Sequence, residues 1–137
     1  MNRRSLQELA RIRLREARTL LRSGYYDGTY YLCGYVVECG LKACIAKRTR
    51  RHDFPEKDRV ESSYTHNLNT LIKVAELHQQ LSKEMKRDSE FASNWGIVKD
   101  WKETSRYERR TRQEAEAIYA AITNREHGVL KWIRQHW

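Results

Sequence analysis

Residues that interrupt helices are scarce in this chain of 137 residues. It contains one proline, Pro55, and six glycines. Few helix breakers in a chain rich in leucine, alanine, glutamate and arginine predict an all-helical fold. A long apolar run is also missing, because the longest one, residues 29–37, ends at Glu38, far short of a bilayer span. The sequence therefore predicts no membrane association.

Motifs of common catalytic and metal sites are missing as well. The chain has no glycine-rich phosphate loop, no HExxH motif and no recognisable Ser/His/Asp arrangement. Its three cysteines, Cys33, Cys39 and Cys44, are odd in number, lack CxxC spacing and have no histidine among them. We interpret them as small buried apolar residues, and we expect no disulfide, metal or cofactor.

Charge, in contrast, is abundant and mostly positive. Charged residues make up 33% of the chain, the formal net charge is +9 and the mean hydropathy is -0.90. Residues 1–17 lack the apolar core of a signal peptide, so the expected compartment is the cytoplasm. We predict a single soluble domain over residues 1–137, and the positive balance favours polyanionic partners.

Hydrophobic periodicity and capping signals divide the chain into an up-and-down helical bundle of four to five helices. A capping box of Ser5 and Glu8 predicts the first helix start, and one of Thr111 and Glu114 predicts the last. The predicted helices cover about residues 5–24, 27–48, 67–77, 81–101 and 111–137. Residues at about 49–65 lack periodicity and are predicted to form a mobile surface loop.

The second predicted helix is apolar nearly all round, which predicts a buried central helix. Gly34 and Gly40 within it are expected to permit the close approach of neighbouring helices. Glu38 and Lys42 lie four residues apart in this apolar surrounding, in the favourable helical order. We interpret them as a structural ion pair that fixes helix docking, because a buried charge is costly unless it is paired.

Two basic segments are candidates for anion binding. In the first helix a stripe of arginines lies within a sector of about 60° beside the apolar face. Its members are Arg4, Arg11, Arg15, Arg18 and Arg22. Only Glu8 and Glu16 are available as partners in that helix, so a solvated face and a surface that binds RNA or a partner both stay open. Residues 105–112, with Arg106 and Tyr107, suit a phosphate or form an ordinary basic loop.

Three segments taken together resemble the HEPN domain family. They are "ARTLLRSGYYDGTYYLCGYVVECGLKA" at residues 17–43, "THNLNTLIK" at residues 65–73, and "SRYE" at residues 105–108 ahead of "AEAIYAAI". The resemblance covers nearly the whole chain. It implies a compact all-α bundle, commonly a homodimer, with members in RNA metabolism, toxin–antitoxin pairs and phage defence. It also implies that Glu38, Lys42, Arg106 and Tyr107 are polar features of the bundle, and we infer that Glu38 accepts a hydrogen bond from Arg106.

Some family members are metal-independent ribonucleases with an Arg and a His a few residues apart, and others lack this motif and sit beside minimal nucleotidyltransferases. No histidine follows Arg106 at that spacing. The one formal match, Arg59 with His66, carries little information in so arginine-rich a chain, and His66 is interpreted as support for a helix start. We therefore predict that Arg59 and His66 are not a catalytic pair.

The sequence thus predicts an accessory module, with no catalytic residue, that binds RNA, a nucleotide or a nucleotidyltransferase-type partner in a toxin–antitoxin or defence system. The predicted binding residues are Arg11, Arg15, Arg18, Arg22, Arg106 and Tyr107. The alternative is a metal-independent HEPN endoribonuclease, in which a histidine would act as the base and an arginine would stabilise the phosphorane. A third possibility is a purely structural bundle that binds a protein partner.

Overall fold

The computed structural model describes residues 1–49 and 57–137, and the side chains of all of these except residues 57–59. Within these ranges the chain forms eight α-helices and one 3-10 helix, with no strand. This confirms the all-α prediction, although the helices are more numerous and shorter than predicted. The predicted loop at 49–65 falls partly outside the described residues, at 50–56, and its second half contains helix α3 (Lys57–Ser63) instead.

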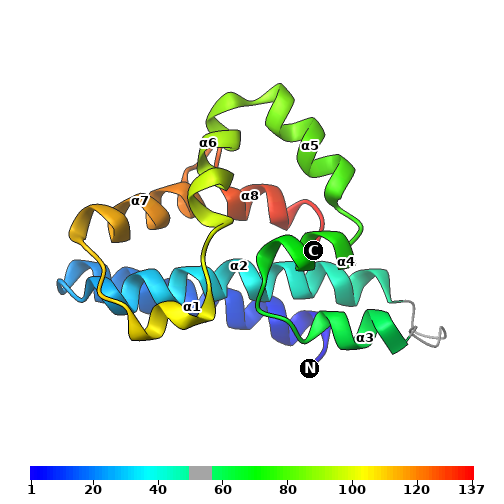
Figure 1. Cartoon of the computed structure of the whole chain (residues 1–137), viewed down its shortest axis with the longest axis horizontal. Coiled ribbons are helices and arrows are strands. Elements are labelled where there is room, and N and C mark those ends of the chain that lie inside the picture. The colour runs from blue at the N-terminus through cyan, green and yellow to red at the C-terminus, as the bar shows by residue number, and fades with distance from the viewer. Residues whose placement is uncertain (50–56) are drawn as a thin grey trace.

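Helices α1 (Arg3–Arg22) and α2 (Tyr26–Arg48) form an antiparallel pair along the longest axis of the molecule (Figure 1). Gly24 adopts a positive φ of 80° in the turn between them, a conformation that glycine enters without strain. The predicted cap at Ser5 is wrong. Asn2 caps α1 instead, because its side-chain oxygen accepts from the Ser5 amide at 2.8 Å.

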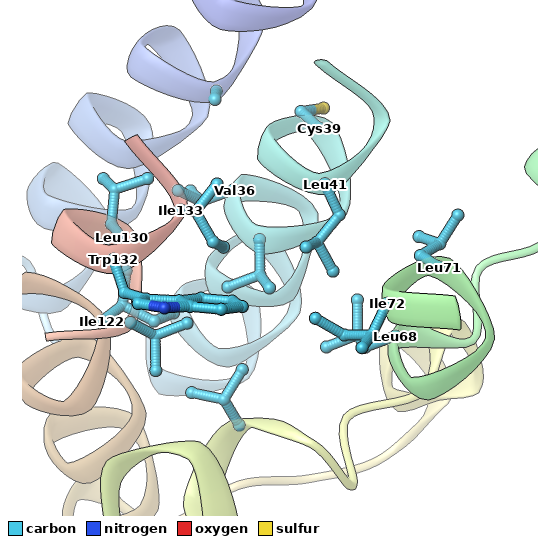
Figure 2. Close-up of a cluster of buried hydrophobic side chains, with 14 of the residues drawn as sticks. Val36, Cys39, Leu41, Leu68, Leu71, Ile72, Ile122, Leu130, Trp132 and Ile133 are labelled. Carbon is cyan, nitrogen blue, oxygen red and sulfur yellow. The ribbon is translucent and has the colours of Figure 1, made fainter. Parts of the chain in front are cut away.

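Helix α2 is the centre of the fold, as predicted, and contacts α1, α4 (Leu68–Val74), α7 (Arg112–Thr123), α8 (Val129–Arg134) and the 3-10 helix η1 (Glu103–Tyr107). Figure 2 shows side chains of α4, α7 and α8 converging on it.

Both glycines of α2 permit close packing. A Cβ on Gly34 would lie 1.9 Å from the Trp101 ring, and one on Gly40 would lie 2.9 Å from Ile133. The close approach expected at these two positions is therefore confirmed.

The predicted helix at 81–101 is interrupted. It forms α5 (His78–Arg87) and α6 (Ser89–Val98), separated by Asp88 in an extended conformation. The Asp88 side chain accepts from the amides of Glu90 and Phe91 at 3.1 Å, so it caps α6. Its second oxygen lies 2.6 Å from Nδ1 of His127, which ties this break to the turn before α8.

The predicted helix at 111–137 is also interrupted. Its start is correct, because Thr111 and Glu114 form the expected capping box. The helix ends before Asn124, whose side-chain oxygen accepts from the amides of Glu126 and His127. The backbone at Gly128 then lies so close to Asn124 that a Cβ on Gly128 would lie 2.3 Å from the Asn124 carbonyl oxygen. The expectation that the helix continues past Gly128 is therefore wrong.

Helix α4 packs on the core through Leu68, Leu71 and Ile72, which are buried. No helix in the described ranges has the length and apolar character needed to cross a membrane. The chain is thus organised around one apolar helix, α2, whose buried residues include the polar side chain of Glu38.

Candidate functional site

The arginine stripe of α1 is exposed along its whole length. The two carboxylates of this helix are already engaged, because Glu8 pairs with Arg4 at 3.6 Å and Glu16 pairs with Arg13. Three further guanidinium groups have no ion-pair or hydrogen-bond partner among the described side chains. They belong to Arg15, Arg18 and Arg22. This leaves a surface of fixed positive charge that no carboxylate of the described residues neutralises.

The positive surface of α1 continues onto the C-terminal part of the chain at Trp137. The Arg11 guanidinium lies 5.1 Å from the Trp137 ring centroid, and that of Arg134 lies 5.7 Å from the same ring. Arg3 donates to the Trp137 backbone oxygen at 3.1 Å. The indole ring therefore joins α1 to the end of α8 and brings basic groups from both together.

A cavity of about 360 Å³ lies beside this junction, between α1 and the α7–α8 region. Its lining has an apolar part and a polar, basic part. The lining residues are Leu14, Ile122, Thr123, Asn124, Arg125, Leu130, Lys131 and Arg134. No carboxylate is among these described residues, so the cavity is rich in donors and positive charge. The sequence did not single out Arg125, Lys131 or Arg134, because nothing in their spacing indicates that they share a cavity with α1.

A second polar cluster surrounds Glu38 on α2, which is only 4% exposed. One of its oxygens lies 2.6 Å from Nδ1 of His66, and the other lies 3.5 Å from the Lys42 ammonium. Nε2 of His66 lies 2.9 Å from a Glu103 oxygen. The imidazole thus bridges two carboxylates, and the buried charge of Glu38 has a partner on each oxygen.

Two expectations about this cluster are wrong. His66 does not support the start of α4, because Asn67 caps that helix by accepting from the Thr70 amide at 3.0 Å. Arg106 is not the partner of Glu38. Its guanidinium lies 4.8 Å from the Tyr107 ring centroid, and a hydrogen bond to the Tyr31 hydroxyl raises the pKa of Arg106. Arg106 and Tyr107 therefore form an exposed stacked pair at the end of η1.

Aromatic rings connect the stacked pair with the buried carboxylate. The hydroxyls of Tyr31 and Tyr35 lie 3.3 Å apart, and the Tyr35 ring packs edge-on against both His66 and Trp101. Burial, followed by the hydrogen bond to Tyr31, raises the pKa of Tyr35. The hydroxyl therefore stays protonated at neutral pH and acts as a donor or acceptor rather than as an anion.

The three cysteines are free and buried. Burial raises the pKa of Cys33 to about 12 and that of Cys39 to about 11, which disfavours the reactive thiolate form at neutral pH. Within the described ranges, no group of three His, Cys, Asp or Glu side chains is placed to hold a metal ion.

Comparison with known proteins agrees with the resemblance noted in the sequence. The HEPN domain family matches residues 4–133. The comparisons with curated proteins and with solved structures gave no significant match. The matched segment includes the arginine stripe, the Glu38 cluster and the basic cavity except for Arg134. Because the match covers nearly the whole chain, the protein belongs to the HEPN domain family.

Proposed function

We propose that this protein is a non-catalytic module that binds single-stranded RNA through the arginine face of α1, made of Arg11, Arg15, Arg18 and Arg22. The observation that carries the proposal is that three of these four guanidinium groups have no partner among the described side chains. Guanidinium groups form planar, bidentate hydrogen bonds with phosphate oxygens, and unpaired ones on one helix face suit a phosphate backbone.

Membership of the HEPN domain family supports a nucleotide- or RNA-related role. The exposed Arg106–Tyr107 pair suits the same ligand, because an aromatic ring stacked with arginine offers a platform for an unpaired base. A single strand is favoured over a duplex because its bases are free to stack. The arginine face would then bind the backbone, and Tyr107 would contact a base elsewhere on the molecule.

The family resemblance also implies partners. In this proposal the module is a homodimer, or binds a nucleotidyltransferase, within a toxin–antitoxin or defence system. Light scattering on the purified protein tests the dimer, and co-purification with the product of an adjacent nucleotidyltransferase gene tests the partner. Both interactions are tested separately from RNA binding, because neither experiment uses RNA.

The decisive experiment is an RNA-binding titration by fluorescence anisotropy, with a short labelled single strand at low salt. Replacing Arg15 and Arg18 together with glutamate should weaken binding by more than tenfold, since two contacts become two repulsions. The matched control is Lys83→Glu with Lys86→Glu, two exposed lysines of α5, a helix that lies on the opposite side of the molecule from α1 in Figure 1.

The control carries the same change of four charges, so it corrects for a loss of net charge alone. The RNA proposal requires that the α1 variant binds much more weakly than the α5 variant. Equal weakening in both variants, or a wild-type protein that does not bind RNA at low salt, would contradict it. In the second case the arginine face would serve a protein partner.

The second candidate is the endoribonuclease, and one observation favours it. Glu38 accepts a hydrogen bond from Nδ1 of His66 and so orients the imidazole, as a buried carboxylate does for a catalytic base. Glu103, however, engages the other ring nitrogen, which leaves neither nitrogen open to a substrate in this conformation. The side chain of Arg59, its formal partner in the sequence, lies outside the described residues. Incubation of RNA with wild-type and His66→Gln protein in a chelator separates the two functions, since a structural His66 predicts no cleavage by either.

A further inference from the structure

A groove of about 730 Å³ lies where the start of α1, the last turns of α2 and the end of α3 meet. Figure 1 shows the start of α1 and helix α3 next to each other below the end of α2. The groove is separate from the arginine face, because none of Arg11, Arg15, Arg18 and Arg22 lines it. It is therefore a surface that the proposed RNA binding does not use.

Apolar side chains at the edge of this groove are open to solvent. Tyr64 and Met1 are 75% and 84% exposed, and Ala46 of α2 is half-buried. Leu6 and Ile45 belong to the buried core and close the groove on its inner side. An exposed aromatic ring with polar neighbours is typical of a surface that binds another protein, whereas a small-molecule site covers most of its ligand.

The charge of the groove is positive. Arg3 and Lys42 line it, and none of its described lining residues carries a carboxylate. The Lys42 ammonium has three N–H donors, and Glu38 is its one ion-pair partner among the described residues, at 3.5 Å. Arg3 donates through one nitrogen to the Trp137 backbone oxygen at 3.1 Å. Both cations keep further N–H donors, so the groove favours a ligand that carries carboxylates.

Two hydroxyl groups add hydrogen-bond acceptors to the same groove. Thr49 donates to the Ile45 backbone oxygen at 3.2 Å, and Ser63 donates to the Val60 backbone oxygen at 2.6 Å. Because a hydroxyl has a single proton and each is used locally, these oxygens offer lone pairs to a ligand. The matching ligand therefore has N–H donors as well as carboxylates. A fatty acid lacks the N–H groups, whereas an acidic peptide has both.

We propose that this groove docks an acidic, amphipathic peptide segment of a protein partner. Carboxylates of the segment pair with Lys42 and Arg3, and its backbone N–H groups donate to the hydroxyls of Thr49 and Ser63. An apolar side chain of the segment packs on the Tyr64 ring. A second copy of this chain fits poorly, because each copy has a net charge of +9 and would bring like charges together.

Fluorescence anisotropy with a short, capped and labelled peptide of leucine and glutamate tests the docking on the full-length protein. A peptide with glutamine for glutamate, or with serine for leucine, should bind at least about tenfold more weakly, because each lacks one half of the contacts. Titration with the leucine–glutamate peptide should move the amide chemical shifts of residues 42–49 and 60–64. No saturable binding, equal affinity for the serine peptide, or shifts confined to residues 11–22 would overturn the proposal.

Two variants test the groove itself. Ala46→Glu places a negative charge in it and should weaken binding of the leucine–glutamate peptide by at least about tenfold. The matched control is Ala120→Glu, an exposed position on α7 that does not line the groove, which should change the affinity by less than about twofold. Equal effects of the two changes overturn the proposal.

Tyr64→Ser keeps the test decisive if circular dichroism shows that Ala46→Glu does not fold. It removes a largely exposed ring and should weaken peptide binding several-fold. An unchanged affinity in this variant also overturns the proposal.

RNA is the other polyanion that a basic groove attracts. Excess single-stranded RNA should leave the peptide bound, and Arg15→Gln with Arg18→Gln should leave the peptide affinity unchanged, since neither residue lines the groove. Displacement of the peptide by RNA, with RNA-induced shifts at residues 42–49, would assign the groove to RNA and overturn the proposal. Peptide binding by a protein that does not bind RNA leaves the docking standing while the RNA proposal fails, and RNA binding without peptide binding does the reverse.

Discussion

Glu38 and His66, 28 residues apart in the sequence, are joined by a contact of 2.6 Å between a carboxylate oxygen and Nδ1 of the imidazole. This contact ties the middle of α2 to the segment that leads into α4. Because the other ring nitrogen contacts Glu103 at the start of η1, one histidine holds three parts of the chain together. His66 is therefore a structural centre of the polar cluster.

Replacing Glu38 with glutamine should destabilise the protein by about 3 kcal/mol, because it removes the buried charge that pairs with the Lys42 ammonium and contacts the His66 ring. Urea denaturation followed by circular dichroism measures this loss. Glu8→Gln is the control, since its pair with Arg4 is exposed and should contribute less than about 1 kcal/mol. Similar losses in both variants would show that the Glu38 cluster does not stabilise the bundle.

Two glycines in helices should respond in opposite directions to alanine. Gly34→Ala places a methyl group inside the space of the Trp101 ring, and should destabilise by about 1–3 kcal/mol or more through overpacking. Gly96→Ala, in α6, meets nothing within 4 Å and should stabilise by about 0.5–1 kcal/mol. Thermal unfolding of both variants checks the signs; a tolerated Gly34→Ala would mean that Trp101 can move away from α2.

His127 should make stability depend on pH. The hydrogen bond with Asp88 raises the pKa of His127 from its ordinary 6.5, with further contributions from Glu90 and Glu126, and it lowers the pKa of Asp88 from its ordinary 3.8. A raised histidine pKa stabilises the fold below 6.5, and this stability is lost as pH rises through the raised value. The Asp88 contribution is present above 3.8 and is lost as pH falls through the lowered value.

The measurement compares the unfolding free energy of wild-type protein and His127→Gln across pH. The difference should be largest between 3.8 and 6.5 and should shrink towards alkaline pH. His136→Gln serves as a contrast, because burial lowers the pKa of His136. The contribution of His136 to the stability of the wild-type protein should therefore decrease as pH falls below 6.5. A constant difference for His127→Gln would show that its contact with Asp88 does not persist in solution.

The affinity for RNA should fall with salt in proportion to the number of arginines that contact phosphate. Each contact with a single strand contributes roughly -0.7 to the slope of log affinity against log salt, so Arg11, Arg15, Arg18 and Arg22 together give a slope of about -2.8. Arg15→Gln with Arg18→Gln should leave a slope of about -1.4. Titrations at several salt concentrations give both slopes, and coincident slopes would exclude these two arginines as phosphate contacts.

Local signals in the sequence were sufficient for part of the fold. The capping box at Thr111 depends on residues only three positions apart, and the apolar surface of α2 is visible as a continuous run. The breaks within the two predicted helices at 81–101 and 111–137 were missed because the apolar spacing continues through each break. At Asp88 the cap signal was present in the sequence, whereas at Gly128 the need for glycine arises only from contact with the Asn124 carbonyl.

The candidate sites likewise combine features that local sequence predicts with features that depend on contacts between distant segments. The exposure of Arg15 and Arg18 followed from the periodicity of a single helix and from the shortage of nearby carboxylates. The contact between Glu38 and His66, and the cavity that brings Leu14 together with Arg125, depend on how distant segments pack. No spacing in the sequence encodes those distances, so only the three-dimensional structure reveals them.

Helix α1 has its packing residues on one side and its exposed arginines on another. Its apolar side, with Ala10 and Ala17 fully buried against the rest of the bundle, fixes how the helix packs. Arg15, Arg18 and Arg22 are exposed, and their guanidinium groups form no hydrogen bond or ion pair with the described side chains. Mutations can therefore accumulate on the arginine side without a penalty in stability. The same scaffold can acquire a new ligand by changing one side of one helix, which makes α1 the natural place to diversify in a library.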